Sequence, residues 1–417
     1  MVPKGWSHTT FEKHIDCLTG YAFSSTEYSA EEHDIRLLRG DNIEPGKLRW
    51  INAKRWPRNV QENMDKYFLL EGDFVIALDR TWISGGLKVA EVTCDDLPCL
   101  LVQRVARIRA KKTLAQGLLR QYFSGYKFER YVKLTQTATA VPHISPNDIK
   151  QFSLLLPPIA EQKKIAQILS TWDKAISVTE KLLTNSQQQK KALMQQLLTG
   201  KKRLLDENGV RFSGDWNSSK LGDLFNFKKG KGLSKSDLSE SGINKCILYG
   251  ELYTKYAEIA YEVISRTNSS DGQLSEPGDI LLPASTTTSG IDLANATALS
   301  EGGILLGGDI NILRPKVRLS SPFLAYFLTH MKKNEISSRA QGITIIHLYG
   351  GDLKSIDIVL PSTVQEQQKI ATVLSAADAE ISTLEKKLAC LRDEKKALMQ
   401  QLLTGKRRVK VDEAVAV

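Results

Sequence analysis

The sequence lacks any run of eighteen apolar residues, the length at which a membrane-spanning helix becomes a candidate. Its first residues are polar and have no apolar core of the kind found in secretory signal peptides. Cysteine is scarce, and the five cysteines are irregularly spaced, so they indicate no disulfide framework. A hydrophobic content of 41% and a charged content of 25% are typical of a globular protein, which we expect to be soluble and cytoplasmic.

Signatures of catalysis are also missing. No Gly-x-x-x-x-Gly-Lys-Ser/Thr phosphate loop occurs, and no Gly-x-Gly-x-x-Gly follows a predicted strand. The double proline at 157–158 lies in Leu-Pro-Pro-Ile, which is not the Asn/Asp-Pro-Pro-aromatic motif of amino-methyltransferases. Cys94 and Cys99 have no second pair to complete a zinc site, and Asp95-Asp96 have no third acid for a nuclease metal site. The sequence therefore predicts a chain without catalytic residues, cofactor or metal, and an enzyme with an unfamiliar motif is the weaker alternative.

Acidic residues are outnumbered by basic ones. The 57 Lys and Arg against 47 Asp and Glu give a formal net charge of +10. Such an excess favours an anionic partner, of which nucleic acid is the commonest, over a merely soluble basic surface.

What the sequence does contain is an exact internal repeat. The segment Lys-Lys-Ala-Leu-Met-Gln-Gln-Leu-Leu-Thr-Gly-Lys occurs at 190–201 and again at 395–406. Upstream, Glu-Gln-Lys-Lys-Ile-Ala at 161–166 corresponds to Glu-Gln-Gln-Lys-Ile-Ala at 366–371, at the same offset of 205 residues. Because a repeat at one offset reflects a repeated structural unit, these two segments define the architecture.

Both repeated segments are expected to be long helices. Apolar residues recur at alternating spacings of four and three over about five heptads, which is the pattern of a coiled-coil seam. Proline precedes each segment, and Gly200 and Gly405 are the expected stops. The seam is less apolar in the first helix, where Thr179, Ser186 and Lys190 interrupt it. The residues expected to pair the helices are Ile165, Leu169, Trp172, Ile176, Leu183, Leu193, Leu197, Ile370, Leu374, Ile381, Leu384, Leu388, Leu391, Leu398 and Leu402.

A helix over 161–199 would be ~58 Å long at 1.5 Å per residue. If the second helix pairs with the first, it runs back along it, so the pair is antiparallel and the two halves of the chain are related by an approximate twofold axis. The alternative is a separate core helix in each half. We expect two mixed α+β domains separated by an antiparallel coiled coil, with a first domain at 1–156, a first helix at 157–203, a second domain at 204–360 and a second helix at 361–408.

The two domains share a set of framework positions, but the segments between those positions differ in sequence. Glu-Gly-Asp-Phe-Val-Ile at 71–76 corresponds to Pro-Gly-Asp-Ile-Leu-Leu at 277–282, and His143 corresponds to His347, for which we expect a structural role. We predict strands at 74–78, 100–109, 149–156, 280–283, 304–313 and 353–360, and short helices at 118–123 and 322–328. One scaffold with two different binding surfaces fits this pattern.

Basic, hydroxyl and amide side chains gather in the segments that differ. Such groups suit contacts to phosphates, and Arg, Asn and Gln also suit the edges of bases in the major groove. The candidates for DNA contact are Arg49, Lys54, Arg55, Arg58, Arg80, Trp82, Lys111, Lys112, Lys228, Lys231, Tyr253, Lys255, Thr286, Thr287, Arg339 and Gln341.

Over essentially its whole length the chain resembles the specificity subunits of type I restriction–modification systems. The resemblance is most specific in the Pro-x-x-x-Glu-Gln-x-Lys-Ile-Ala helix openings at Pro157 and Pro361 and in the repeated helix ends. It implies two target-recognition domains, each reading one half of a split, asymmetric DNA sequence, with the paired helices setting the spacer.

The resemblance also implies partners. The helices would dock two modification (methyltransferase) subunits that bind S-adenosylmethionine, and restriction subunits would add ATP- and Mg-dependent translocation and cleavage. This chain itself would hold no cofactor. The bases read, the spacer length and the stoichiometry do not follow from the sequence. The other class of function that the sequence allows is a stand-alone coiled-coil scaffold whose heads bind proteins.

Overall fold

The computed structural model describes residues 2–58 and 62–411, which divide into two compact units. Unit 1 comprises Met1–Glu180 and Lys386–Val417, and unit 2 comprises Lys181–Glu385. Each unit holds one mixed α/β head and parts of both long helices. We refer to residues 2–156 as the first head and to residues 204–360 as the second head. None of the helices in the described residues is long and apolar enough to cross a membrane.

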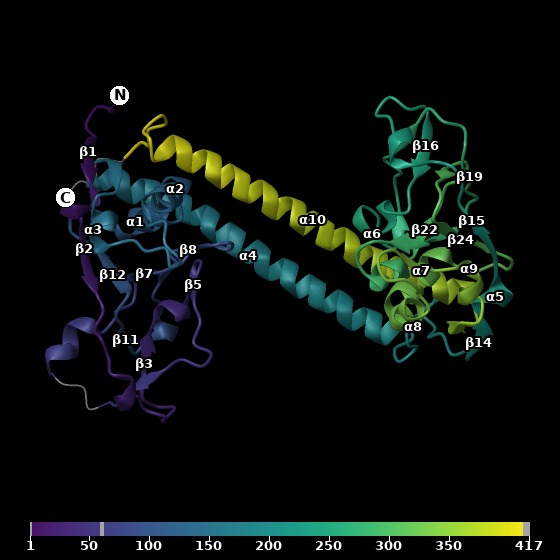
Figure 1. Ribbon diagram of the computed structural model, residues 1–417, viewed down its shortest axis with the longest axis horizontal. Coiled ribbons are helices and arrows are strands. Elements are labelled where there is room, and N and C mark those ends of the chain that lie inside the picture. The colour runs from purple at the N-terminus through teal and green to yellow at the C-terminus, as the bar shows by residue number, and fades with distance from the viewer. Residues whose placement is uncertain (1, 59–61, 412–417) are drawn as a thin grey trace. The chain divides into compact units, whose positions relative to one another are not determined.

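The two long helices are α4 (Ile159–Leu197) and α10 (Val364–Leu402), each of 39 residues (Figure 1). They begin and end within two residues of the predicted helix at 161–199 and its repeat. Gly200 and Gly405 follow the helix ends with φ of +70° and +67°, the left-handed conformation that terminates helices and that glycine adopts without strain. The predicted stop signals are therefore confirmed.

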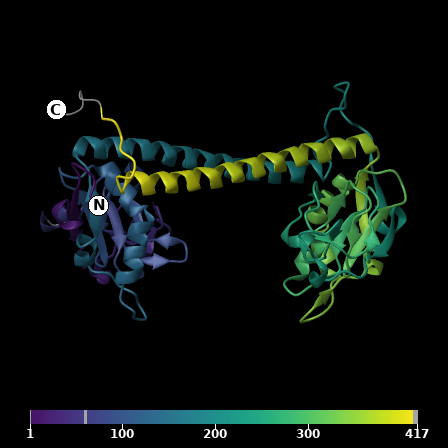
Figure 2. The ribbon, with the colours of Figure 1, turned by 90° about the horizontal axis from the view of Figure 1, so that it is seen from above.

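Within each unit the two helices run antiparallel. In unit 1 the end of α10 lies beside the start of α4 (Figure 2), where Lys395 Nζ is 2.5 Å from Asp173 Oδ1. In unit 2 the equivalent pair, displaced by 205 residues, joins Lys190 Nζ to Asp378 Oδ1 at 2.5 Å. The same ion pair thus occurs once in each unit, with the roles of the two helices exchanged.

The first head contains a four-stranded sheet in the order β10-β7-β12-β2 and a three-stranded sheet in the order β11-β3-β6. In the larger sheet the central strand β12 is antiparallel to both neighbours, and in the smaller one β11 is parallel to β3. The strands are β1 (Ser7–Thr10), β2 (Ile15–Thr19), β3 (Ile35–Leu38), β4 (Ile43–Glu44), β5 (Lys47–Leu48), β6 (Arg55–Trp56), β7 (Phe74–Ala77), β8 (Trp82–Ile83), β9 (Gly86–Leu87), β10 (Val89–Glu91), β11 (Cys99–Leu101), β12 (Val105–Ala110) and β13 (Ser153–Leu156).

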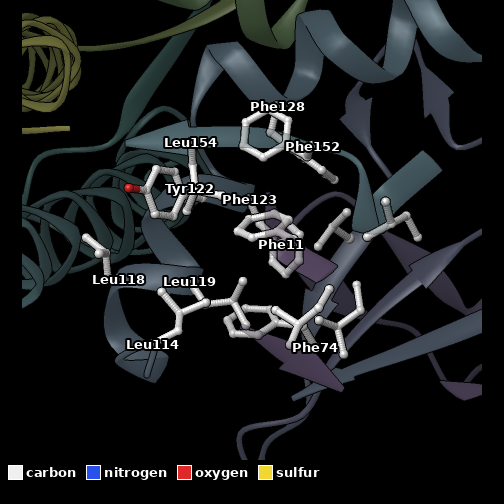
Figure 3. Packing of buried hydrophobic residues seen from close by; sticks show 14 of the residues in the cluster. Phe11, Phe74, Leu114, Leu118, Leu119, Tyr122, Phe123, Phe128, Phe152 and Leu154 are labelled. Carbon is white, nitrogen blue, oxygen red and sulfur yellow. The ribbon is translucent and has the colours of Figure 1, made fainter. Parts of the chain in front are cut away.

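An aromatic cluster joins the larger sheet to the helices of the first head. Phe11 is completely buried and lies among the rings of Tyr122, Phe123, Phe128 and Phe152 (Figure 3), with ring centroids 5.0 to 6.3 Å apart and mostly tilted or edge-on. The same apolar core includes residues from the start of α4 and the end of α10, so it fixes the helix pair to this head. The helices that contribute are α1 (Gln116–Phe123), α2 (Tyr126–Thr135) and α3 (Pro146–Lys150).

The second head repeats this plan with a five-stranded sheet in the order β15-β24-β20-β22-β17 and a four-stranded sheet in the order β18-β16-β23-β19. Its strands are β14 (Trp216–Lys220), β15 (Phe225–Lys229), β16 (Asn244–Ile247), β17 (Ile259–Ala260), β18 (Arg266–Thr267), β19 (Gln273–Leu274), β20 (Ile280–Pro283), β21 (Ser285–Thr286), β22 (Thr297–Leu299), β23 (Leu305–Leu306), β24 (Ile310–Pro315), β25 (Ile346–His347) and β26 (Asp357–Pro361). Its helices are α5 (Leu221–Leu224), α6 (Glu251–Thr254), α7 (Ser321–Met331), α8 (Lys333–Ser338) and α9 (Gly350–Leu353).

Two predicted long strands are wrong in the same way. The predicted strand at 100–109 is divided into β11 and β12, and the one at 304–313 is divided into β23 and β24. The turns that divide them contain Arg104 and Asp309, whose φ values of +64° and +58° interrupt the extended backbone. In each head the two strands on either side of this turn belong to different sheets, so the turn connects the two sheets.

The predicted strand at 149–156 is also too long, because its start lies in α3 and in the turn that follows. Ser145 caps this helix by accepting a hydrogen bond from the Asp148 backbone nitrogen, and Pro146 occupies the first turn. The predicted strand at 353–360 likewise begins in α9, and its extended part is β26.

Matched glycines allow the close approach of two backbone segments in each head. A Cβ on Gly20 would lie 2.2 Å from the Val102 carbonyl oxygen, and one on Gly230 would lie 1.9 Å from the Gly307 carbonyl oxygen. Since both obstacles are backbone atoms, the clash cannot be relieved by a rotamer change. Each head therefore requires a glycine at this position for a steric reason.

We expect Gly230→Ala to lower the free energy of unfolding of unit 2 by about 1–3 kcal/mol, the typical cost of overpacking. Gly351→Ala is the matched control, because its Cβ would meet nothing within 4 Å. Urea unfolding of the two variants provides the measurement, and equal midpoints would contradict the steric role of Gly230.

Candidate nucleic-acid interface

A polar pocket of about 350 Å³ opens on the first head where the smaller sheet meets the end of β7. Its charged lining comes from the loop after β3, the loop after β7, β9–β10 and the turn between β11 and β12. The charged residues that line it are Arg39, Asp41, Asp79, Arg80, Lys88 and Arg104. Four cations and two carboxylates leave the pocket with a positive balance, which suits a ligand with acceptor groups.

Asp79 is the organising carboxylate of this pocket. Arg104 Nη1 donates to Asp79 Oδ2 at 2.5 Å, and His143 Nδ1 lies 2.7 Å from Asp79 Oδ1. Burial alone would raise the pKa of Asp79, but the hydrogen bonds from Arg104 and His143 outweigh it and lower the pKa. Asp79 is therefore ionised at neutral pH and fixes the position of the Arg104 guanidinium. The structural role expected for His143 agrees with this contact.

Two arginines of the pocket have an unusual backbone. Arg80 has a φ of +47° and Arg104 a φ of +64°, a region that residues other than glycine seldom occupy. Such conformations are retained where the surrounding structure imposes them, and they gather at functional sites. The pocket brings both of these residues together.

The second head has a smaller pocket of about 240 Å³ beside the corresponding turn, which otherwise has a different lining from β15, β24 and the residues around α9. Its polar lining includes Lys228, Lys229, Asp309, Asn311 and His347. Asp309 corresponds to Arg104, because both are left-handed residues in the turn before the last strand of the main sheet.

The partners of these two turn residues correspond as well. Ser285 pairs with His347 in the sheet register as Asp79 pairs with His143. Ser285 Oγ donates to Asp309 Oδ2 at 3.1 Å, and Lys229 Nζ lies 3.7 Å from Asp309 Oδ1. The turn residue has thus changed from a cation to an anion between the heads.

Among the basic residues predicted to contact DNA in the first head, several remain accessible. The exposed ones are Arg49, Lys54, Arg58, Arg80, Lys111 and Lys112. Lys111 Nζ donates to the Glu12 carbonyl oxygen at 3.3 Å.

Four first-head candidates, two of them exposed, contact neighbouring segments of the same head. Arg49 Nε is 3.3 Å from Glu44 Oε1. Arg55 and Arg58 each donate to a backbone carbonyl oxygen, at 3.0 and 2.8 Å. Trp82 is half-buried, with its indole nitrogen 3.2 Å from Glu129 Oε1 and Lys133 Nζ 4.1 Å from its ring centroid. Its ring is therefore already occupied within the head.

In the second head, Lys228, Thr287 and Gln341 are exposed. Lys231 is also exposed and lies 3.7 Å from Asp271. Lys255 pairs with Glu251 at 2.7 Å, and Tyr253 is half-buried.

Two second-head candidates do not have the surroundings we expected. Thr286 is completely buried in β21, with its hydroxyl 2.8 Å from that of Thr288, so its side chain does not reach the surface. Arg339 donates to the Asp352 carbonyl oxygen at 2.8 Å and to the Ser355 hydroxyl at 2.6 Å, which are contacts that stabilise the fold.

All fifteen residues predicted to pair the helices are buried or half-buried. The polar interruptions of the seam are also satisfied: Thr179 donates to the Ala175 carbonyl oxygen at 2.8 Å, and Ser186 donates to Glu380 at 2.9 Å. Near the helix ends the seam widens, because Leu198 and Met399 become buried against the heads. The heptad pattern did not identify these two residues.

Arg104, Asp79 and Asp309 were not among the predicted site residues. For Arg104, the only sign of a turn in the sequence was a short polar interruption, Gln103-Arg104, between two apolar runs. In the described part of the chain, no group of three or more His, Cys, Asp or Glu side chains is arranged to hold a metal ion.

Comparison with known proteins identifies the family. The model for the type I restriction modification DNA specificity domain matches residues 35–185 and 213–391, which is more than half of the chain. The chain therefore belongs to this family, and it carries two copies of the domain.

Individual relatives agree with this assignment. The chain is 34% identical over 182 residues to the type I restriction enzyme EcoAI specificity subunit of Escherichia coli, a match that covers 43% of this chain and 30% of that one. It is 29% identical over 209 residues to the MjaVIII specificity subunit of Methanocaldococcus jannaschii, covering 50% of this chain and 48% of that one. These matches span less than half the length of either relative.

A longer match is to the putative MjaX specificity subunit of the same archaeon, with 27% identity over 388 residues, 90% of this chain and 87% of that one. Among solved structures, the S subunit of a type I restriction–modification system from M. genitalium shares the fold, with a TM-score of 0.62, 16% identity and 96% of each chain covered.

Proposed function

We propose that this chain is the DNA-recognition subunit of a type I restriction–modification complex, and that each head reads one half of an asymmetric, split DNA sequence. The observation that carries this proposal is the pair of corresponding left-handed turns, each of which lines a pocket. The turns occupy the same framework position in two copies of one domain, yet one presents Arg104 and the other Asp309. Two unlike half-sites require two copies of one fold that present different base-contacting side chains.

The helix pair supplies the spacer in this proposal. Paired helices resist bending, so the separation between the two reading surfaces becomes part of what is recognised. The same helices are the expected docking surface for two modification subunits, which would bind S-adenosylmethionine. Restriction subunits, with ATP and Mg, would complete the complex in the cytoplasm, and this chain would hold no cofactor of its own.

The chain itself is proposed to be non-catalytic. Methylation-aware sequencing of a genome that carries this chain with its modification subunits should reveal one split motif with unlike halves. The isolated chain should neither methylate nor cut DNA. A continuous or symmetric motif, or methyl transfer by the isolated chain, would contradict the proposal.

Binding of duplex DNA by this chain should weaken steeply with salt, because each neutralised phosphate releases condensed counterions. With about six phosphate contacts we expect a loss of about 1,000-fold between 50 and 200 mM salt. Fluorescence anisotropy with a labelled duplex gives the slope, and Lys112→Gln should reduce it by about 1 if Lys112 contacts a phosphate. A protein-binding scaffold would instead show salt-insensitive partner binding and no preference for duplex DNA.

A further inference from the structure

The pocket of the first head contains one guanidinium that is held in place by a carboxylate. The Arg104 side chain is 70% exposed, and within the described residues its one hydrogen bond is the one from Nη1 to Asp79. The Nε–H and the Nη2–H groups therefore remain as an adjacent pair of donors. Such a pair matches two neighbouring acceptors, as guanine presents with N7 and O6 in the major groove.

The contact with Asp79 favours a base over a phosphate as the ligand. Pairing with a carboxylate cancels the net charge of Arg104, which weakens its attraction to a phosphate. It leaves the donors in place and restricts their orientation, which is what base recognition needs. Neighbouring Arg80 and Lys88 keep the pocket positive and are better suited to the backbone.

The second head reverses this chemistry at the same position. Asp309 is an acceptor: Ser285 Oγ donates to its Oδ2 at 3.1 Å, and Lys229 Nζ lies 3.7 Å from its Oδ1. A carboxylate has spare acceptor capacity after one hydrogen bond, and on base edges its counterpart is an exocyclic amino group.

We propose that Arg104, positioned by Asp79, reads a guanine in the half-site of the first head, and that Asp309 accepts a hydrogen bond from a base amino group in the half-site of the second head. This inference rests on the proposed function and adds the chemical identity of one base contact in each half. Arg104 is the contact residue, and Asp79 is a positioning residue that acts through it.

The test begins with the complex of the wild-type chain and its modification subunits. Selection from random-sequence duplexes gives the two half-sites and their spacing. If no split motif is selected, the proposed function itself fails, and the assignment of Arg104 fails with it. If a split motif is selected but the half-site of the first head shows no dependence on a guanine, only the assignment of Arg104 is overturned.

The variants then identify the contact. Arg104→Ala should reduce discrimination at one guanine by about 10- to 100-fold and leave the other half-site unchanged. Arg104→Asn is the second variant, because asparagine tolerates the left-handed backbone and keeps the turn intact. Uniformly weaker binding to all sequences, with a salt slope reduced by about 1, would instead assign Arg104 to a phosphate and overturn the proposal.

The Asp79→Asn variant distinguishes the positioning of Arg104 by Asp79 from the effect of the Asp79 charge on DNA affinity. It removes a negative charge, so binding to non-target DNA should be unchanged or tighter, while discrimination at the same guanine should fall. A purely electrostatic pocket would gain affinity for every sequence and keep its discrimination, which would overturn the positioning role. Asp309→Asn is the matched control, and it should alter base preference only in the other half-site.

Discussion

Duplicating residues 174–180 of α4 together with residues 388–394 of α10 should lengthen the spacer of the recognised sequence by about three base pairs. The two segments lie in unit 1, next to the Asp173–Lys395 ion pair that aligns the helices. Seven residues add ~10.5 Å to a helix, and the duplex rises ~3.4 Å per base pair. Because a whole heptad is added to both helices, the apolar seam keeps its register.

Both half-site sequences should be unchanged in this variant, since no head residue is altered. Methylation-aware sequencing of cells that express it with the modification subunits gives the new motif. A heptad added to α4 alone is the control. It moves the two helices out of register, so that either the Asp173–Lys395 or the Lys190–Asp378 ion pair cannot form, and methylation should be lost. New half-site bases with the old spacing would show that the helices do not determine the spacer.

The helices were predictable because their information is local and repeated. A heptad pattern present twice at one offset predicts two long helices, and the glycine stops set their ends to within a few residues. The partners of the polar seam residues were not predictable in this way. Lys190 looked like an interruption, and only the antiparallel alignment shows that it meets Asp378 from the opposite helix.

The base-reading candidates were predictable only in part. Arg80 follows a buried strand, and its basic loop gave a signal in the sequence. Arg104 lies in a two-residue polar interruption of a segment that we predicted as one continuous strand, and its left-handed backbone is not marked by a glycine. Thr286 looked accessible in a run of hydroxyl residues, but β21 pairs with β25 and turns it inward. Accessibility depends on tertiary pairing, which composition does not reveal.

The Glu-Gln motif at the start of each long helix has a structural explanation. Gln162 and Gln367 each donate to the proline carbonyl oxygen that precedes their helix and accept a hydrogen bond from a head backbone nitrogen. Glu366, at 1% exposure, accepts two hydrogen bonds from Arg203, at 2.5 and 2.6 Å. Glu161 does the same with Arg408, at 2.8 Å twice. Each pair joins the start of one helix to the segment that follows the other.

Arg203→Ala should therefore destabilise unit 2 by about 3–5 kcal/mol, because it leaves the Glu366 carboxylate buried and without its counter-ion. Arg408→Ala should cost less, since the Trp6 indole nitrogen still donates to Glu161 at 2.9 Å. Hydrogen–deuterium exchange of residues 364–378 measures the local opening free energy in unit 2. Adding Glu366→Gln to Arg203→Ala should restore part of the loss, because a neutral amide is cheaper to bury than a charge. A cost for Arg203→Ala below about 1 kcal/mol, as for a surface ion pair, would show that Glu366 reaches solvent and that the pair does not join the two helices.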